Sequence, residues 1–253
     1  MKKWVVGILL LVGIMVPGQA FALLGLVSIE GAVGGFWAEP SGNLQYKNGT
    51  DGDVETLLGF DEETLGVARL RMELPLILPN IYLMATPMEF DGTLTGNFTY
   101  KGETFTASDS ASLTLDQYDI ALFYGIPFLG LVTLDRLSVD FGINVRIVSL
   151  DATVTSSNPS IASRSESMDV PVPMAFLAAR LKLLAGLSLE AEIRALDVDY
   201  ARVISAIGRV KYDTFGPFFV TAGYRHEEVA VDEDDIDMDV EFAGPFVEVG
   251  LSF

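Results

Sequence analysis

A single histidine is the first candidate for catalysis in this chain of 253 residues, which has no cysteine and therefore no thiol nucleophile. A histidine acts as a general base when a nucleophile or an orienting carboxylate lies within hydrogen-bonding reach. His226 stands in Tyr224-Arg225-His226-Glu227-Glu228, so neither a serine two positions later nor an aspartate two positions earlier is present. We interpret His226 as a rim residue at the level of the lipid headgroups or at the base of a loop, and the sequence predicts no enzymatic activity.

Clustered carboxylates are the second candidate, because hard cations such as Ca²⁺ prefer oxygen ligands. The acidic run from Asp232 to Asp239 lacks the glycine and the fixed spacing of an EF-hand loop. We interpret it as a solvated loop, in which Asp232, Asp234 and Asp235 are candidates for binding a cation. The sequence predicts no other metal site and no cofactor.

The chain as a whole is acidic, but its N-terminus is positively charged. With 35 acidic and 16 basic side chains the net charge is −19, which argues against nucleic acid as a partner. At the N-terminus, by contrast, Lys2 and Lys3 precede the uncharged apolar stretch from Trp4 to Val16, and Ala20-Phe21-Ala22 matches a small-x-small cleavage site. We expect residues 1–22 to be a cleaved signal peptide and residues 23–253 to form one exported domain.

Apolar residues at every second position predict β-strands through the rest of the chain. The pattern is clearest from Leu137 to Ile147, where six apolar side chains fall on one face and polar residues and glycine fall on the other. Interpreting Leu196 to Gly208 as a short amphipathic helix would leave eight strands instead of ten. The ten predicted strands are approximately residues 26–38, 66–76, 80–90, 114–125, 136–150, 170–183, 187–197, 203–213, 217–230 and 238–253.

The connections alternate between polar, mostly long segments (residues 39–65, 91–113, 151–169 and 231–237) and tight links. Outer-membrane barrels combine long extracellular loops with short periplasmic turns in this way. Beyond residue 22 no apolar run is long enough for a membrane-spanning helix, so the exported chain can enter a membrane only as a barrel. We therefore predict an all-β fold, a closed antiparallel transmembrane β-barrel of about ten strands in the bacterial outer membrane.

Alternation alone does not decide which face meets lipid, since a soluble sandwich buries the face that a membrane barrel exposes. The polar face mixes acidic and basic residues, which a narrow lumen can pair. Aromatic residues near the predicted strand ends are expected to form interfacial belts: Trp37, Tyr82, Phe90, Tyr118, Tyr124, Tyr212, Phe218 and Tyr224. The predicted lumen charge network consists of Glu30, Arg69, Arg71, Glu73, Asp140, Arg146, Arg180, Glu190, Glu192, Arg194, Arg225 and Glu248.

The last predicted strand changes phase along its length. Its apolar residues occupy even positions up to Phe242 and odd positions from Val247 onward, so we expect a β-bulge at Gly244-Pro245. Alternation continues through Val249 and Leu251 to Phe253 at the C-terminus. An alternating strand that ends on an aromatic residue resembles the C-terminal assembly signal of outer-membrane barrels, and this resemblance implies recognition by the barrel-assembly machinery.

Three short motifs resemble a family of small outer-membrane β-barrel proteins that is named for a Gly-Gly pair in the first strand. They are the segments Gly31 to Trp37, Phe242 to Phe246 and Ala222 to Arg225. The resemblance spans the exported chain and implies the fold and the location, without an established activity. Independently of the resemblance, Gly34 and Gly35 indicate close backbone approach or a kink where a barrel bends.

These observations favour a structural or adaptive membrane protein with a charge-filled lumen and no enzymatic activity. The alternative is a narrow channel or uptake barrel for small or hydrophobic molecules, and a lipid-modifying barrel enzyme ranks below both. Expected partners are outer-membrane lipid and lipopolysaccharide, which carboxylates can reach through bridging divalent cations.

Overall fold

The computed structural model describes residues 27–46, 49–75, 77–233 and 236–253. The predicted signal peptide, residues 1–22, lies outside the described residues. Within the described ranges no helix is both long enough and apolar enough to cross a membrane.

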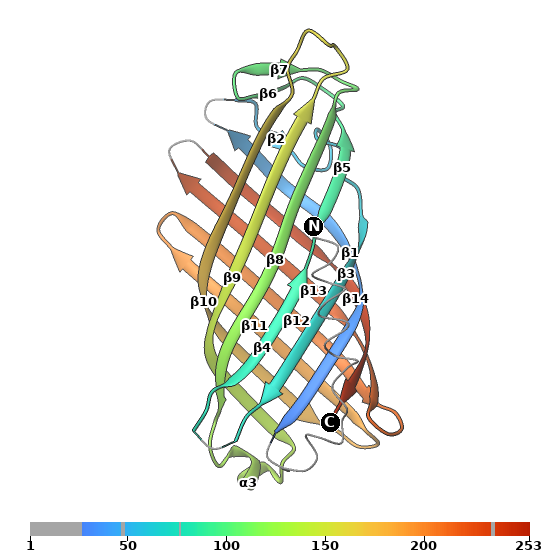
Figure 1. Ribbon diagram of the computed structural model, residues 1–253, viewed down its shortest axis with the longest axis vertical. Helices are drawn as coiled ribbons and strands as arrows, with labels where there is room; N and C mark the ends of the chain where they lie inside the picture. Colours follow the sequence, from blue (N-terminus) through green and yellow to red (C-terminus); the bar gives the residue numbers. More distant parts are fainter. Residues whose placement is uncertain (1–26, 47–48, 76, 234–235) are drawn as a thin grey trace.

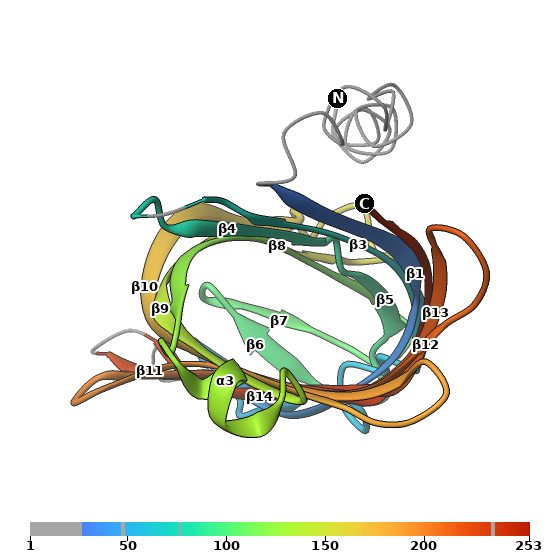
Figure 2. The same ribbon diagram turned by 90° about the horizontal axis from the view of Figure 1, so that it is seen from below.

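The chain forms a closed barrel of antiparallel strands, in which each strand pairs with its sequence neighbours and β1 pairs with β14 to complete the ring (Figures 1 and 2). Strands β4 and β5 pair with β8 one after the other and form a single interrupted strand, which gives a wall of 10 strands. The wall strands are β1 (Ser28–Tyr46), β3 (Glu63–Glu73), β4 (Asn80–Thr86), β5 (Glu89–Thr93), β8 (Ser110–Gly125), β9 (Leu137–Thr155), β10 (Arg164–Lys182), β11 (Leu187–Val198), β12 (Ala201–Asp213), β13 (Phe218–Glu233) and β14 (Ile236–Ser252).

The predicted closed antiparallel barrel of about ten strands is therefore confirmed, and the alternative of eight strands is wrong. The segment read as an amphipathic helix contains the end of β11 and the start of β12, which pair from Leu187 with Tyr212 up to Val198 with Ala201. A tight turn at Asp199-Tyr200 joins the two strands. Backbone pairing with both neighbours thus outweighs the local helical pattern of the sequence.

Most strands are longer than predicted, and several predicted loops are correspondingly shorter. Strands β1, β9 and β10 each have 19 residues, whereas about 9–11 residues suffice to cross the hydrocarbon of a membrane. Much of predicted loops 39–65 and 151–169 is strand, and β13 and β14 extend into predicted loop 231–237. The wall therefore continues well past the thickness of a bilayer.

The two ends of the barrel differ. One end, here called the cap end, carries the hairpin of β6 (Phe98–Tyr100) and β7 (Glu103–Phe105), which crosses the opening in Figure 2. A further short strand, β2 (Gly52–Asp53), pairs with β1 near the same end. The opposite end, here called the turn end, carries the short helix α3 (Leu129–Thr133), tight turns and Phe253 (Figure 1).

Glycines allow close packing between neighbouring wall strands. A Cβ atom on Gly34 would lie 1.9 Å from the carbonyl oxygen of Val247, and one on Gly244 would lie 1.7 Å from the carbonyl oxygen of Trp37. Close backbone approach, expected for the Gly-Gly pair, thus applies to Gly34. At Gly35 the nearest atom would be a Thr64 methyl group at 3.9 Å, which leaves room for a side chain.

Candidate functional site in the barrel lumen

The turn half of the wall is polar inside and apolar outside. On β9, Asp140, Asn144 and Arg146 are buried in the lumen, while Phe141 and Ile143 are 51% and 64% exposed on the outer face. Even-numbered and odd-numbered positions of a strand point to opposite faces of the wall. This arrangement, with apolar side chains outward, is the one that a lipid environment requires.

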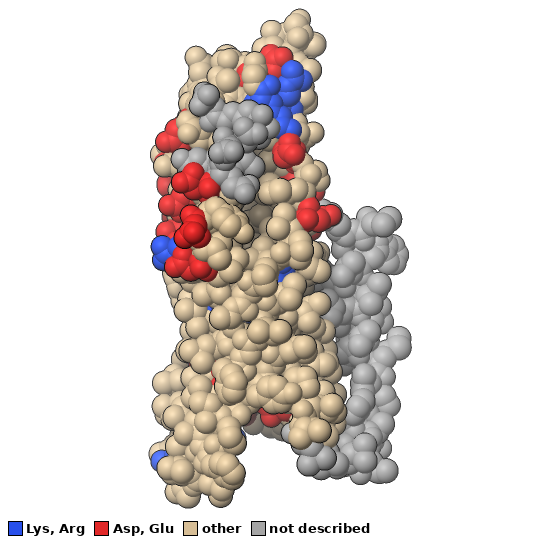
Figure 3. Space-filling model, turned by 90° about the vertical axis from the view of Figure 1, so that its left-hand side faces the viewer, with Lys and Arg blue, Asp and Glu red and all other residues tan. Residues whose placement is uncertain are grey.

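The cap half of the same strands has the opposite arrangement. Further along β9, the even positions Val148, Leu150 and Val154 face the interior, and Ser149 and Asp151 stand at odd, outer positions. The space-filling view shows the same division, with acidic side chains on the outer surface near the cap end and an almost uncharged surface below (Figure 3). The apolar side chains therefore move from the outer face to the inner face along the strand, although even-numbered positions face the lumen throughout.

The predicted β-bulge at Gly244-Pro245 is wrong. Strand β14 keeps one continuous register against β13 and against β1, so its even positions face the lumen throughout. Buried Val240 and Phe242 belong to the apolar interior of the cap half, whereas buried Glu248 belongs to the polar interior of the turn half. The apolar residues change from even to odd positions because the lumen is apolar in the cap half and polar in the turn half, while the strand itself stays regular.

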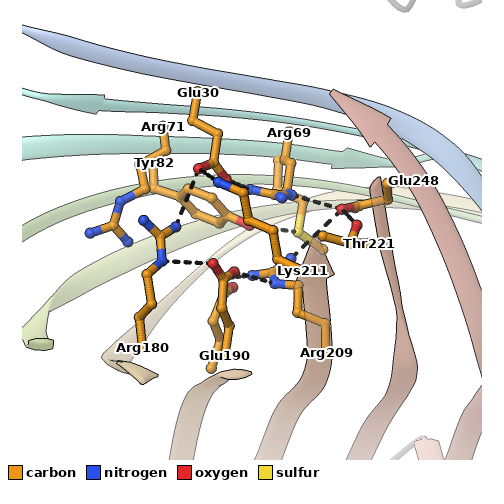
Figure 4. A network of polar contacts seen from close by, with 12 residues as sticks. Glu30, Arg69, Arg71, Tyr82, Arg180, Glu190, Arg209, Lys211, Thr221 and Glu248 are labelled. Atoms are coloured by element: carbon orange, nitrogen blue, oxygen red, sulfur yellow. Dashed lines mark hydrogen bonds and ion pairs between the residues drawn. The ribbon is translucent and has the colours of Figure 1, made fainter. Parts of the chain in front are cut away.

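A first cluster of ion pairs crosses the lumen near the turn end (Figure 4). Glu30 on β1 accepts hydrogen bonds from Arg69 at 2.6 Å and from Lys211 at 2.5 Å, and lies 3.4 Å from Arg180 on the opposite part of the wall. Arg69 also donates to Glu248 at 2.9 Å. Further members of the cluster are Glu190, Glu192, Arg194 and Arg209, and Arg71 separately joins Asp140 to Glu73.

A second cluster lies between the first and the cap half. The Arg146 side chain is fully buried and donates to Asp119 on β8 and, across the lumen at 2.6 Å, to Glu227 on β13. Glu227 also accepts hydrogen bonds from Ser205 and Arg225. Each ion is therefore paired, which lowers the cost of burying charges in a protein interior.

The structure brings together all twelve residues of the predicted lumen charge network. Eleven of them line the lumen with side chains at most 22% exposed, whereas Glu73 is 47% exposed at the turn end. Asp119, Arg209 and Lys211 lie on the same predicted polar face and complete the ion pairs, together with Glu227, which the predicted polar face lacked. Glu227 stands two positions after Arg225, so strict period-two alternation would have identified it.

An apolar cavity occupies the cap half of the lumen above these charges. Its volume is about 100 Å³. Aliphatic and aromatic side chains from several strands and from the segment after β2 make up most of its lining, among them Val54, Leu58, Phe60, Phe98, Tyr100, Leu113, Leu115, Leu150, Met168, Val229, Met238, Val240 and Phe242. Such a cavity favours an apolar occupant over water, which needs polar partners.

Gln117 is a polar exception beneath this lining. It follows Leu115 on the inner face of β8 and is 1% exposed, and neither the nitrogen nor the oxygen of its amide has a hydrogen-bond partner among the described residues. An unpaired buried amide is costly, so it is a group that a bound molecule or a water can satisfy.

The β6–β7 hairpin lies over the cavity at the cap end, where Phe98 and Tyr100 contribute to the lining. Phe98 and Phe105 are buried, while ion pairs tie the hairpin to β10 through Lys101 with Glu166 and through Glu103 with Arg164 at 2.7 Å. The hairpin is therefore a folded part of the barrel.

Asp109 fixes the chain that returns from this hairpin to β8. Its carboxylate accepts hydrogen bonds from the backbone N–H groups of Thr106 at 2.9 Å and Ser157 at 2.7 Å, and from the Ser156 hydroxyl. These donors favour the charged form and lower the pKa of Asp109 to about 2.

The aromatic residues divide between the two faces. Tyr124, Tyr212, Phe218 and Tyr224 are exposed on the outer face, as expected for a belt in contact with a membrane interface. The expectation is wrong for Tyr82 and Phe90, which are buried in the lumen, and Phe90 stacks on Phe242 with ring centroids 5.2 Å apart. Both stand at the even positions that face inward along β4 and β5.

Those polar groups singled out for chemistry that the structure describes lie on the outer face of β13. His226 is on the outer face of β13, with Nε2 4.0 Å from a carboxylate oxygen of Glu228. Of the three aspartates proposed for a loop cation, Asp232 is exposed, and Asp234 and Asp235 lie outside the described residues. In the assembly signal, Val249 and Phe253 are exposed on the outer face and Leu251 is half-buried.

Comparison with known proteins supports the fold but assigns the chain to no family. No family model matches the chain, and no curated protein resembles it in sequence. The outer-membrane protease OmpT of Escherichia coli is similar in structure, with a TM-score of 0.55 and 9% identity over 89% of this chain and 97% of OmpT. OprG of Pseudomonas aeruginosa matches with a TM-score of 0.32 and 11% identity over 90% of this chain and 95% of OprG. At such identities the likeness to OmpT shows that the chain has the fold of an outer-membrane barrel.

Proposed function

We propose that this protein is a non-enzymatic outer-membrane barrel that holds small apolar molecules in the cap half of its lumen, while the charged clusters below prevent free passage of ions. The observation that carries the proposal is the apolar cavity lying directly above two layers of paired charges. The proposal combines two expectations from the sequence, a lumen filled by charges and a barrel that takes up hydrophobic molecules.

The size and lining of the cavity define the class of ligand. A cavity of about 150 Å³ holds one benzene molecule, so a cavity of about 100 Å³ has room for roughly four non-hydrogen atoms. That corresponds to a short alkyl chain, which is smaller than an aromatic ring. Burying such a group against aromatic and aliphatic side chains is favourable because it removes apolar surface from water.

The charged clusters explain why the lumen is not expected to conduct. Arg146 reaches from β9 to β13, and Arg180 reaches from β10 to β1, so side chains connect opposite parts of the wall. In narrow barrels side chains fill the interior, and open aqueous channels belong to wider barrels. A structural role without any ligand is the second candidate, favoured by the same filled lumen.

Location and assembly belong to the same proposal. The apolar outer face of the turn half supports insertion into a bilayer, with the cap end outside the cell and the turn end in the periplasm. We propose export through residues 1–22 and assembly through Val249, Leu251 and Phe253. The acidic outer surface near the cap end supports contact with lipopolysaccharide through divalent cations (Figure 3).

Binding of xenon to the refolded barrel, followed by xenon NMR, tests the proposal because xenon is apolar and small enough for the cavity. Ala111 lines the cavity on β8, so Ala111→Phe is expected to fill it and to lower xenon affinity at least tenfold. Thr114→Phe places the same ring on the outer face of the same strand and serves as the matched control. Equal affinity of both variants and the parent would contradict a lumen site and would favour the structural role.

Conductance separates the proposal from a channel. Single barrels in a planar bilayer are expected to show no steady ion current, because the charge layers remain closed. A steady current that changes with Arg146→Gln would show an open pore and would contradict the proposed plug.

A further inference from the structure

Three ligand-type side chains gather on the outer wall, away from the lumen. His226 and Glu228 stand two positions apart on β13, and Glu241 stands on β14 directly opposite Glu228. Their neighbours Glu227 and Phe242 are buried in the lumen, so the three side chains share the outer face. One potential ligand atom from each of the three lies within 4.8 Å of the other two.

The charges at this place are incompletely balanced within the protein. Two carboxylates directly opposite each other on neighbouring strands repel, and this repulsion destabilises the pair. Arg202 approaches Glu228 at 3.3 Å, but its side chain is 52% exposed. Among the described residues, no hydrogen bond or ion pair engages the Glu241 carboxylate. A second positive charge between the two glutamates would therefore be stabilising.

We infer that His226, Glu228 and Glu241 form a surface site for a divalent transition-metal ion of the Zn²⁺ class. One imidazole nitrogen and two carboxylate oxygens are a donor set suited to Zn²⁺, which binds such atoms at about 2.0–2.2 Å. A tetrahedral ion with these bonds separates its ligand atoms by about 3.4 Å. The present separation of 4.0 Å between His226 Nε2 and Glu228 Oε2 is close to that value, so small side-chain rotations complete the site.

The position of the site on the barrel indicates what a bound ion would face. Tyr224 lies two residues before His226 on the same outer face and is 57% exposed, and it belongs to the aromatic residues that mark the edge of the apolar wall. The three ligands thus lie just beyond that edge. Three protein ligands leave the fourth position of a tetrahedral ion open toward the surroundings.

A Zn²⁺ titration of the refolded barrel against a chromogenic chelator tests this site. The parent is expected to bind one ion per chain, and His226→Ala and Glu241→Gln are each expected to weaken binding at least tenfold. Arg202→Gln is expected to strengthen binding several-fold, because it removes the cation that competes for Glu228. Asp91→Asn, on the outer face of β5, removes one negative charge elsewhere and is expected to leave affinity unchanged.

Heat-dependent gel mobility shows that each variant is folded before its affinity is compared. The absence of saturable binding to the parent would overturn the inference. So would binding that survives both His226→Ala and Glu241→Gln, or binding that Asp91→Asn weakens as much as they do, since that result indicates diffuse attraction to an acidic surface.

Discussion

The turn half and the cap half of the wall are built from the same strands in the same register, yet they place apolar side chains on opposite faces. In the turn half Ile143 points outward and Arg146 inward, and in the cap half Ser149 points outward and Leu150 inward. Successive side chains of a strand point to opposite faces in any environment. Which of the two faces carries the apolar residues therefore depends on whether lipid or water lies outside the wall. One regular β-barrel can therefore combine a lipid-facing wall with a wall that packs like a water-soluble protein.

The largest effect is expected where charge is buried in the turn half. Arg146→Met removes the cation between Asp119 and Glu227, both of which remain buried, and is expected to lower the free energy of unfolding by about 3–5 kcal/mol. Urea-induced unfolding followed by tryptophan fluorescence measures the loss.

Arg202→Gln provides the matched comparison for Arg146→Met. It breaks an exposed ion pair on the outer face of the cap half and is expected to cost less than about 1 kcal/mol. Equal losses for the two variants would mean that the lumen ions are as well solvated as surface ions.

An intermediate effect is expected from adding a charge to the outer face. Ile143→Arg places a cation on the apolar wall and is expected to cost about 2–4 kcal/mol in a bilayer, whereas Ser149→Arg, six residues along β9, is expected to cost at most about 1 kcal/mol. Equilibrium folding into lipid vesicles measures both values. A larger cost for Ser149→Arg than for Ile143→Arg would contradict the assignment of Ile143 to the lipid-facing half and of Ser149 to the water-facing half.

The smallest effect is expected at the cap, where Asp109 holds a single connection. A carboxyl whose pKa is lowered stabilises the fold above its unfolded pKa of about 3.9 and loses this contribution as the pH falls through the folded value of about 2. Pepsin is therefore expected to cut residues 94–109 of the parent faster at pH 1.5 than at pH 3.5, relative to a denatured control. In Asp109→Asn this pH dependence should disappear, and its persistence would show that another group controls the cap.

The comparison of the two halves also explains which features of the structure were predictable from sequence. Alternation from Leu137 to Ile147 identifies a strand in either environment, so the barrel and the lumen position of Arg146 followed from the pattern. The same alternation continues in Val148, Leu150 and Val154 with the polar and apolar faces exchanged. Because this exchange was not expected, the predicted strand ended at Leu150 and residues 151–155 at the end of β9 were predicted to be a loop. Phe242 and Val247 led to a predicted bulge for the same reason.

The cavity and the metal-type cluster could not be predicted, because both depend on pairing across strands. Phe60 and Phe242 line one cavity although 182 positions separate them, and only the closed ring brings them together. His226 was judged by its neighbours in sequence. Its relevant neighbour is Glu241 on the adjacent strand β14, which the register places opposite Glu228 and diagonal to His226 on the same outer face.

A depth scan along the outer face of β9 tests the reversal of polarity most directly. Because the chain has no cysteine, single cysteines can be introduced and spin-labelled at Ile143, Val145, Ile147, Ser149, Asp151 and Thr153. In lipid bilayers, labels at positions 143–147 are expected to be relaxed mainly by oxygen, and labels at positions 149–153 mainly by a water-soluble nickel chelate. Oxygen-dominated relaxation through Thr153, or water access already at Ile143, would contradict a barrel that is apolar outside in one half and apolar inside in the other.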